Sequence, residues 1–141
     1  PGGLTYSGHP LATAAAAATI KAMREEEMVE NAARLGDEII RPALEKMHAN
    51  HPSVGDVRGR GCFWAIELVK NKETREPLAP YGATSEAMNA TIAKIKEYGV
   101  LPFANFNRIH VVPPLNTSDE DVAAGLDAID RALDVADTFT E

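Results

Sequence analysis

The stretch GGLTYSGHP, residues 2–10, combines glycines, hydroxyl side chains and a histidine just before a predicted helix. Glycine-rich loops expose backbone N–H groups and Thr5 adds a hydroxyl, so this loop could bind a phosphate at the helix N-terminus. Glycine and serine also cluster in ordinary turns, which is the alternative interpretation. The alanines at 14–18 then predict a helix that packs closely against another backbone.

A second candidate site lies in NRIHVVPP, residues 107–114. The alternation of a strand puts Arg108 and His110 on one face, and Ile109 and Val111 on the other. An arginine fork beside a histidine can receive a carboxylate. A polar strand face turned to water is the alternative.

Two other groups of residues have spacings or surroundings that could suggest chemistry. His48 and His51 are three residues apart, but no carboxylate or thiol is close in sequence. We therefore expect surface histidines near a helix end, and no metal site. Cys62, next to Phe63, is expected to be a buried small apolar residue.

Basic residues elsewhere are expected to be structural or solvated. Arg58 and Arg60, among the glycines of VRGRG, could contact an anion, but a salt-bridged or solvated turn is the preferred interpretation. The six lysines all lie in polar or helix-surface contexts, and none predicts the buried amine that covalent catalysis needs.

The elements that would position these residues follow from apolar periodicity and from capping residues. Pro10 opens a predicted helix over 11–28, and a second amphipathic segment follows, which Pro42 should kink or interrupt. VRGRG is predicted as a turn before an alternating strand at 63–68. The later elements are a helix from Thr84 or Ser85 to Gly99, two short strands at 100–103 and 108–112, and a final helix capped by Ser118. The expected fold class is therefore α+β, with helices covering a few strands.

Composition limits the function classes. The formal net charge is −7, so nothing supplies a basic stripe for nucleic acid. No apolar run reaches the length of a membrane span, so no membrane partner is expected. A single cysteine is compatible with a reducing, cytoplasmic location. The chain starts at Pro1 in what looks like the middle of a loop, which suggests a fragment of a longer protein.

Three motifs together resemble one family. GGLTYSGHPLATAAAAATI, VGDVRGRGCFWAIEL and GVLPF…RIHVVPPLNTSDEDV…GLDAIDRAL look like the last third of a class III aminotransferase. These are pyridoxal-phosphate enzymes of fold type I, which include the ω-amino-acid transaminases. The resemblance runs along essentially the whole chain. It implies that residues 1–53 end the large domain with a long alanine-rich helical arm, and that residues 54–141 form the small C-terminal domain with its antiparallel or mixed sheet.

The same resemblance assigns roles to the two candidate sites. In the family, the Gly-x-Thr loop crosses a dimer interface and its threonine contacts the cofactor phosphate bound by the neighbouring subunit. Here that residue is Thr5, flanked by Leu4 and Tyr6, so a homodimer is expected. Several members bind the substrate carboxylate with an arginine three residues before the first proline. This chain has His110 there, so we expect Arg108 to bind the carboxylate and His110 to assist.

The family's cofactor-binding lysine and its pyridine-binding aspartate would lie before Pro1, so the chain contains no predicted catalytic residue. We expect the 141-residue chain to have no transaminase activity by itself. The whole protein would move an amino group between an amine or ω-amino acid and a 2-keto acid in a ping-pong reaction. An aminomutase or decarboxylase of the same fold is one alternative. A non-catalytic α+β module that binds a small anion or mediates association is another.

Overall fold

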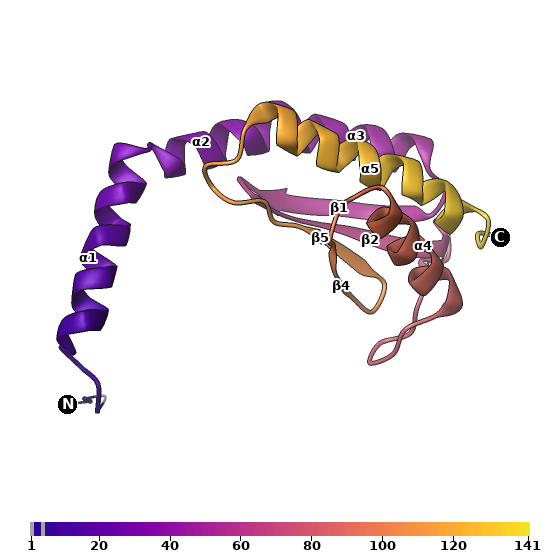
Figure 1. Ribbon diagram of the computed structural model, residues 1–141. Helices are drawn as coiled ribbons and strands as arrows, with labels where there is room; N and C mark the ends of the chain where they lie inside the picture. The colour runs from indigo at the N-terminus through magenta and orange to yellow at the C-terminus, as the bar shows by residue number, and fades with distance from the viewer. Residues whose placement is uncertain (1, 4) are drawn as a thin grey trace.

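The computed structural model describes residues 2–3 and 5–141. The alanine-rich stretch forms α1 (Pro10–Glu25), which has proline in its first turn and no buried residue. Figure 1 shows α1 extending away from the rest of the molecule. The helix predicted over 11–28 ends at Glu25, because Glu27 adopts a left-handed conformation, with φ 48°, between α1 and the next helix.

The segment around Pro42 continues as one helical path instead of breaking. α2 (Met28–Leu35) runs into a π-helical turn (Gly36–Ile40) and then into α3 (Arg41–Asn50). The N–H of Arg41 donates to the carbonyl of Gly36, five residues earlier, which is the π-helical pattern. The interruption predicted at Pro42 therefore takes the form of a widened turn just before it.

The sheet is antiparallel throughout, with strand order β1-β2-β5-β4, and β3 pairs with β2 outside that order. Its strands are β1 (Val54–Arg60), β2 (Phe63–Asn71), β3 (Glu76–Pro77), β4 (Phe103–Asn105) and β5 (Arg108–Val111). α4 (Glu86–Glu97) and α5 (Asp119–Asp137) complete the fold. The expected α+β class is confirmed.

The prediction of a turn at VRGRG is wrong for most of its length, because these residues belong to β1. Glycine is unfavourable in strands, so the sequence pattern concealed this one. The glycines are required by close contacts: Gly59 lies opposite Trp64, and a Cβ on Gly55 would overlap the Val69 side chain. The actual turn begins at Gly61, which has φ +56°.

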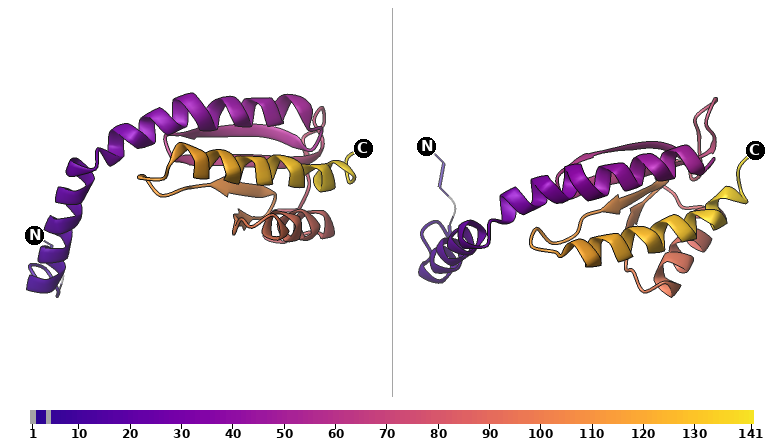
Figure 2. Two further views of the ribbon diagram at one scale, coloured as in Figure 1. Left: turned by 45° about the horizontal axis from the view of Figure 1, so that its top comes forward. Right: turned by 90° about the horizontal axis from the view of Figure 1, so that it is seen from above.

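Helices cover one face of this sheet. In Figure 2, α2–α3 and α5 lie side by side over the strands, and α4 packs beside α5. Apolar side chains from both layers form one core, including Leu44, Ile66, Met88, Ile109 and Leu133. On the opposite face, alternate residues of β2, β4 and β5 stay exposed or half-buried. The helices thus position β5 with one side in the core and one side accessible.

The predicted helix ends are confirmed in detail. The hydroxyls of Ser85 and Ser118 accept hydrogen bonds from the N–H groups of Met88 and Asp121. At the end of α4, the N–H groups of Gly99 and Val100 donate to the carbonyls of Lys96 and Ile95, with Gly99 at φ +90°. This is the Schellman arrangement, which turns the chain toward β4. In the part of the chain that the structure describes, no helix is long and apolar enough to cross a membrane.

Candidate functional site

The N-terminal loop presents its predicted residues on the surface. Leu4 lies outside the described residues. Thr5 and Tyr6 lie in an exposed turn over residues 5–8, and the N–H of His9 donates to the carbonyl of Tyr6 at 3.1 Å. Tyr6 is 78% exposed, and its ring centroid lies 5.9 Å from that of His9. Both predicted side chains are thus accessible to a ligand or another subunit.

The start of α1 is suited to an anion. Its first turn contains no acidic residue, and no side chain caps it by a hydrogen bond. The first N–H groups of a helix carry a partial positive charge and lack intrahelical acceptors. This end of the chain thus presents helix N–H groups and the exposed Thr5, which are donors of the kind that bind anions.

The second predicted site lies on the accessible face of the sheet. Arg108 and His110 are half-buried on that face, whereas Ile109 and Val111 are buried in the core, which confirms the predicted alternation. Cross-strand register sets His110 beside Ala65 and Phe103, and Arg108 beside Glu67. The two residues are therefore neighbours, while α1 holds the Thr5 loop well away from β5 (Figure 1).

The charges around Arg108 leave its guanidinium accessible. Arg58 pairs with Asp56 of its own strand, β1, and with Glu67 of β2, the residue opposite Arg108. Among the residues that the structure describes, Arg108 forms no ion pair, and its guanidinium carbon lies 5.8 Å from the Phe106 ring centroid. An arginine with an unused fork can bind a carboxylate bidentately.

The surroundings of His110 favour its neutral form. Partial burial, and secondarily the positive charge of Arg108, lower the pKa of His110 below its ordinary value of 6.5. The rings of Phe103 and Phe63 flank it, with centroids 5.1 and 6.3 Å away. At neutral pH, His110 thus contributes an uncharged aromatic ring, and Arg108 supplies the charge.

Replacing Arg108 with glutamine is expected to raise the pKa of His110, because a repelling cation is removed. Burial persists in the variant, so the pKa should stay below 6.5. NMR titration of the imidazole signals in both proteins measures this. Arg24→Gln, on exposed α1, is the control and should leave the pKa unchanged. An unchanged pKa in Arg108→Gln would contradict the proximity of the two side chains.

The same shift makes stability depend on pH. Below pH 6.5, unfolded chains protonate this histidine before the folded protein does. His110 should therefore lower the free energy of unfolding as the pH falls from about 6.5 through its folded pKa. Urea denaturation of the wild type and His110→Phe measures this difference. A pH dependence that is identical in both proteins would contradict the lowered pKa.

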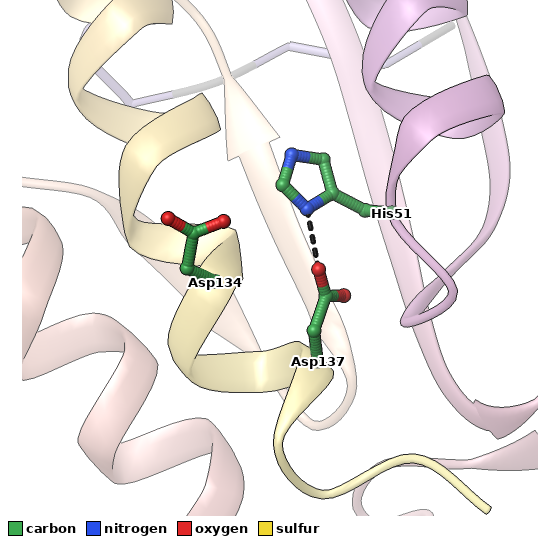
Figure 3. A group of neighbouring side chains, drawn as sticks. All are labelled: His51, Asp134 and Asp137. Atoms are coloured by element: carbon green, nitrogen blue, oxygen red, sulfur yellow. Dashed lines mark hydrogen bonds and ion pairs between the residues drawn. The ribbon is translucent and has the colours of Figure 1, made fainter.

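A third group of residues, His51 with aspartates of α5, was not predicted. The prediction that His51 lies on the surface is wrong. His51 is 8% exposed, and its Nδ1 and Nε2 lie 2.6 and 3.1 Å from carboxylate oxygens of Asp137 and Asp130. Figure 3 shows His51 with Asp134 and Asp137 of α5, a set whose atoms lie within 4.8 Å of one another. Both ring nitrogens already contact carboxylates, so the arrangement is a structural contact that joins the end of α3 to α5.

The remaining predictions for individual side chains hold. Cys62 is buried, and burial raises the pKa of its thiol. All six lysines are among the described residues, and each is exposed or half-buried. Arg58 forms the predicted salt bridges, although it lies on a strand and not in a turn.

Comparison with known proteins agrees with this geometry. Residues 2–133 match the family described as aminotransferase class-III. Taurine–pyruvate aminotransferase of Bilophila wadsworthia is 35% identical over 136 residues, which cover 92% of this chain and 28% of that protein. Ethanolamine-phosphate phospho-lyase homolog 1 of Caenorhabditis elegans is 33% identical over 132 residues, covering 92% of this chain and 27% of that protein.

Solved structures give the same result. Taurine:2-oxoglutarate aminotransferase from Bifidobacterium kashiwanohense, in complex with PLP and glutamate, superposes with a TM-score of 0.88 and 36% identity. The match covers 97% of this chain and 30% of that one. The chain thus spans less than a third of the length of these relatives. With the family match extending from the Thr5 loop into α5, the chain belongs to the class-III aminotransferases.

Proposed function

We propose that the whole protein is a pyridoxal-phosphate-dependent aminotransferase that moves an amino group between an amine or ω-amino acid and a 2-keto acid. The observation that carries this proposal is the family match over residues 2–133. The aminotransferases among the relatives support transfer over the alternative of a non-catalytic module. When bound, the cofactor supplies the electron sink of the reaction, and the protein supplies binding and orientation.

We propose the following roles for the chain's own residues. Thr5, with Leu4 and Tyr6 beside it, would hold the cofactor phosphate of the neighbouring subunit. Arg108 would bind the carboxylate of the keto acid or amino acid, and His110 would assist by packing against it. The exposed Thr5 turn, the uncapped start of α1 and the unpaired fork of Arg108 support these assignments.

We also propose a homodimer in the cytoplasm. α1 has no buried residue along its length, so the helix offers a surface that a second subunit would cover. A single, free cysteine suits a reducing compartment. The division into residues 1–53 and 54–141 remains a prediction. Leu35, Leu44 and Met47 share a core with the sheet, so a boundary drawn on packing alone would fall between α1 and α2.

Initial-rate kinetics of the complete gene product test the proposed reaction. An amine such as taurine or 5-aminovalerate is varied at several fixed concentrations of pyruvate or 2-oxoglutarate. Parallel double-reciprocal lines are expected, because each substrate reacts with a different form of the enzyme in a ping-pong mechanism. Consumption of the amine that does not depend on the keto acid would favour a lyase, as the name of one relative suggests.

Thr5→Val tests the phosphate contact in the same protein. The loss of one hydroxyl that donates to a charged phosphate should raise the Kd for the cofactor about tenfold, which corresponds to about 1.4 kcal/mol. Thr19→Val is the matched control, because the Thr19 hydroxyl donates within α1 to the carbonyl of Ala15 at 2.9 Å. Equal cofactor affinities in Thr5→Val and Thr19→Val would contradict the assignment.

A further inference from the structure

The accessible face of the sheet combines arginines with exposed aromatic rings. The register sets Arg58, Ala65, His110 and Phe103 in one row across four strands. The next row toward the β5 N-terminus contains Glu67, Arg108 and other polar residues. Ala65 is small and lies between larger side chains. The surface of the sheet is therefore recessed at Ala65 relative to the aromatic rings and the arginines.

We refer to Phe63, Phe103 and His110 as the aromatic wall. Phe63 is 64% exposed and Phe103 66% exposed, and their rings flank the imidazole on both sides. Aromatic rings left open on one surface, beside each other, commonly mark a binding surface. The lowered pKa of His110 keeps the wall uncharged at neutral pH.

Arg108 and Arg60 are cations of this face that form no ion pair among the described residues, whereas Arg58 pairs with Asp56 on its own strand and with Glu67 on β2. Arg108 lies in the row next to that of His110. Residues two apart on a strand are about 7 Å apart, so the backbone positions of Arg108 and His110 are separated by about the length of a short hydrocarbon group. The surface is therefore matched to a ligand with a carboxylate at one end and an apolar group at the other.

For a short dicarboxylate bound on Arg108, the nearest cation at the wall, Arg58, is already paired with Asp56 and Glu67. The other, Arg60, lies opposite Phe63, four strand residues or about 13 Å along the strands from the row of Arg108. Placing its second charge against the phenyl rings would remove water from the charge without supplying a partner.

We propose that this face recognises monocarboxylates with an aromatic or other apolar body, with the carboxylate on Arg108 and the body on the aromatic wall. The inference rests on the proposed function, in which Arg108 binds the substrate carboxylate, and it names the class of that substrate. Apolar amino and keto acids are favoured over those with a second carboxylate.

Binding of simple probes to the 141-residue chain tests this without cofactor or turnover. 3-Phenylpropionate, propionate, glutarate and 3-phenylpropan-1-ol are titrated, and the aromatic ¹H–¹³C signals of the aromatic wall are followed by NMR. 3-Phenylpropionate should shift these signals with a Kd at least about tenfold lower than those of the other three probes. Equal affinity for glutarate, or no shift with 3-phenylpropionate at tens of millimolar, would overturn the proposal.

Variants separate the two halves of the surface. Arg108→Gln should weaken the binding of 3-phenylpropionate until its Kd equals that of 3-phenylpropan-1-ol. Arg108→Lys, which keeps the charge without the fork, should bind with an intermediate Kd. Phe103→Ser should weaken the binding of 3-phenylpropionate but leave the affinity for propionate unchanged. Arg24→Gln on α1 is the control, and backbone spectra check that each variant is folded. Unchanged affinity in folded Arg108→Gln would overturn the proposal.

The outcome also separates this inference from the proposed reaction. Amino transfer by the complete protein, without selective probe binding here, would overturn the substrate class alone. Selective binding that depends on Arg108, without amino transfer, would support the ligand class and overturn the proposed reaction.

Discussion

Replacing Gly59 with alanine is expected to lower the free energy of unfolding by about 3 kcal/mol. Gly59 lies opposite Trp64 in the β1–β2 pair. An added Cβ would lie 2.5 Å from the Trp64 Cα and closer still to the Phe63 carbonyl oxygen. Both are backbone atoms of the paired strand, so a rotamer change cannot relieve the overlap, and β1 would have to move away from β2.

Gly125→Ala is the matched control for this prediction, and its effect should have the opposite sign. A Cβ at Gly125, inside α5, would meet nothing within 4 Å. Alanine in a helix interior is favoured over glycine by about 1 kcal/mol, so this variant should be more stable than the wild type. Urea denaturation followed by far-ultraviolet circular dichroism measures both changes. Equal stabilities of Gly59→Ala and the wild type would contradict the strand pairing at VRGRG.

Removing the carboxylate of Asp137 should lower the free energy of unfolding by an amount comparable to that of Gly59→Ala. One of its oxygens accepts from the N–H and the hydroxyl of Ser53, at 3.1 and 2.6 Å, and the other contacts His51 Nδ1 at 2.6 Å. Asp137→Ala therefore leaves three buried or half-buried donors without this acceptor. Breaking such a network should cost about 3 kcal/mol of unfolding free energy, because the polar groups stay buried without partners.

Asp127→Ala provides the comparison for Asp137→Ala on the same helix. Asp127 is exposed and contacts Arg131 at 3.5 Å, four residues along α5. Exposed pairs of this kind contribute about 0.5 kcal/mol or less. The same denaturation experiment should therefore separate the two variants by about 2 kcal/mol or more. Similar stabilities would contradict a structural role for the His51 contacts.

The sequence was sufficient for features that depend on local patterns. Helix caps need only a few neighbouring residues, and Ser85, Ser118 and Gly99 all act as expected. Alternation in β5 likewise located Arg108 and His110 on one accessible face. The family motifs extended these local predictions to the whole chain.

Features that depend on distant residues were not predicted. The carboxylates that contact His51, those of Asp130 and Asp137, lie 79 and 86 residues away in sequence. A signal was nonetheless present, because Asp130, Asp134 and Asp137 recur on one face of α5 at helical spacing. β1 was missed because its glycines reflect contacts with Trp64 and Val69 on another strand, which no local propensity reveals.

The central claim is that the whole protein transfers an amino group to a keto acid. The most direct measurement follows a ¹⁵N label from a donor amine after incubation of the complete protein with cofactor and an unlabelled 2-keto acid. ¹⁵N is expected in the amino acid formed from that keto acid, and none in free ammonia. Release of the label as ammonia, with the keto acid unchanged, would contradict this claim.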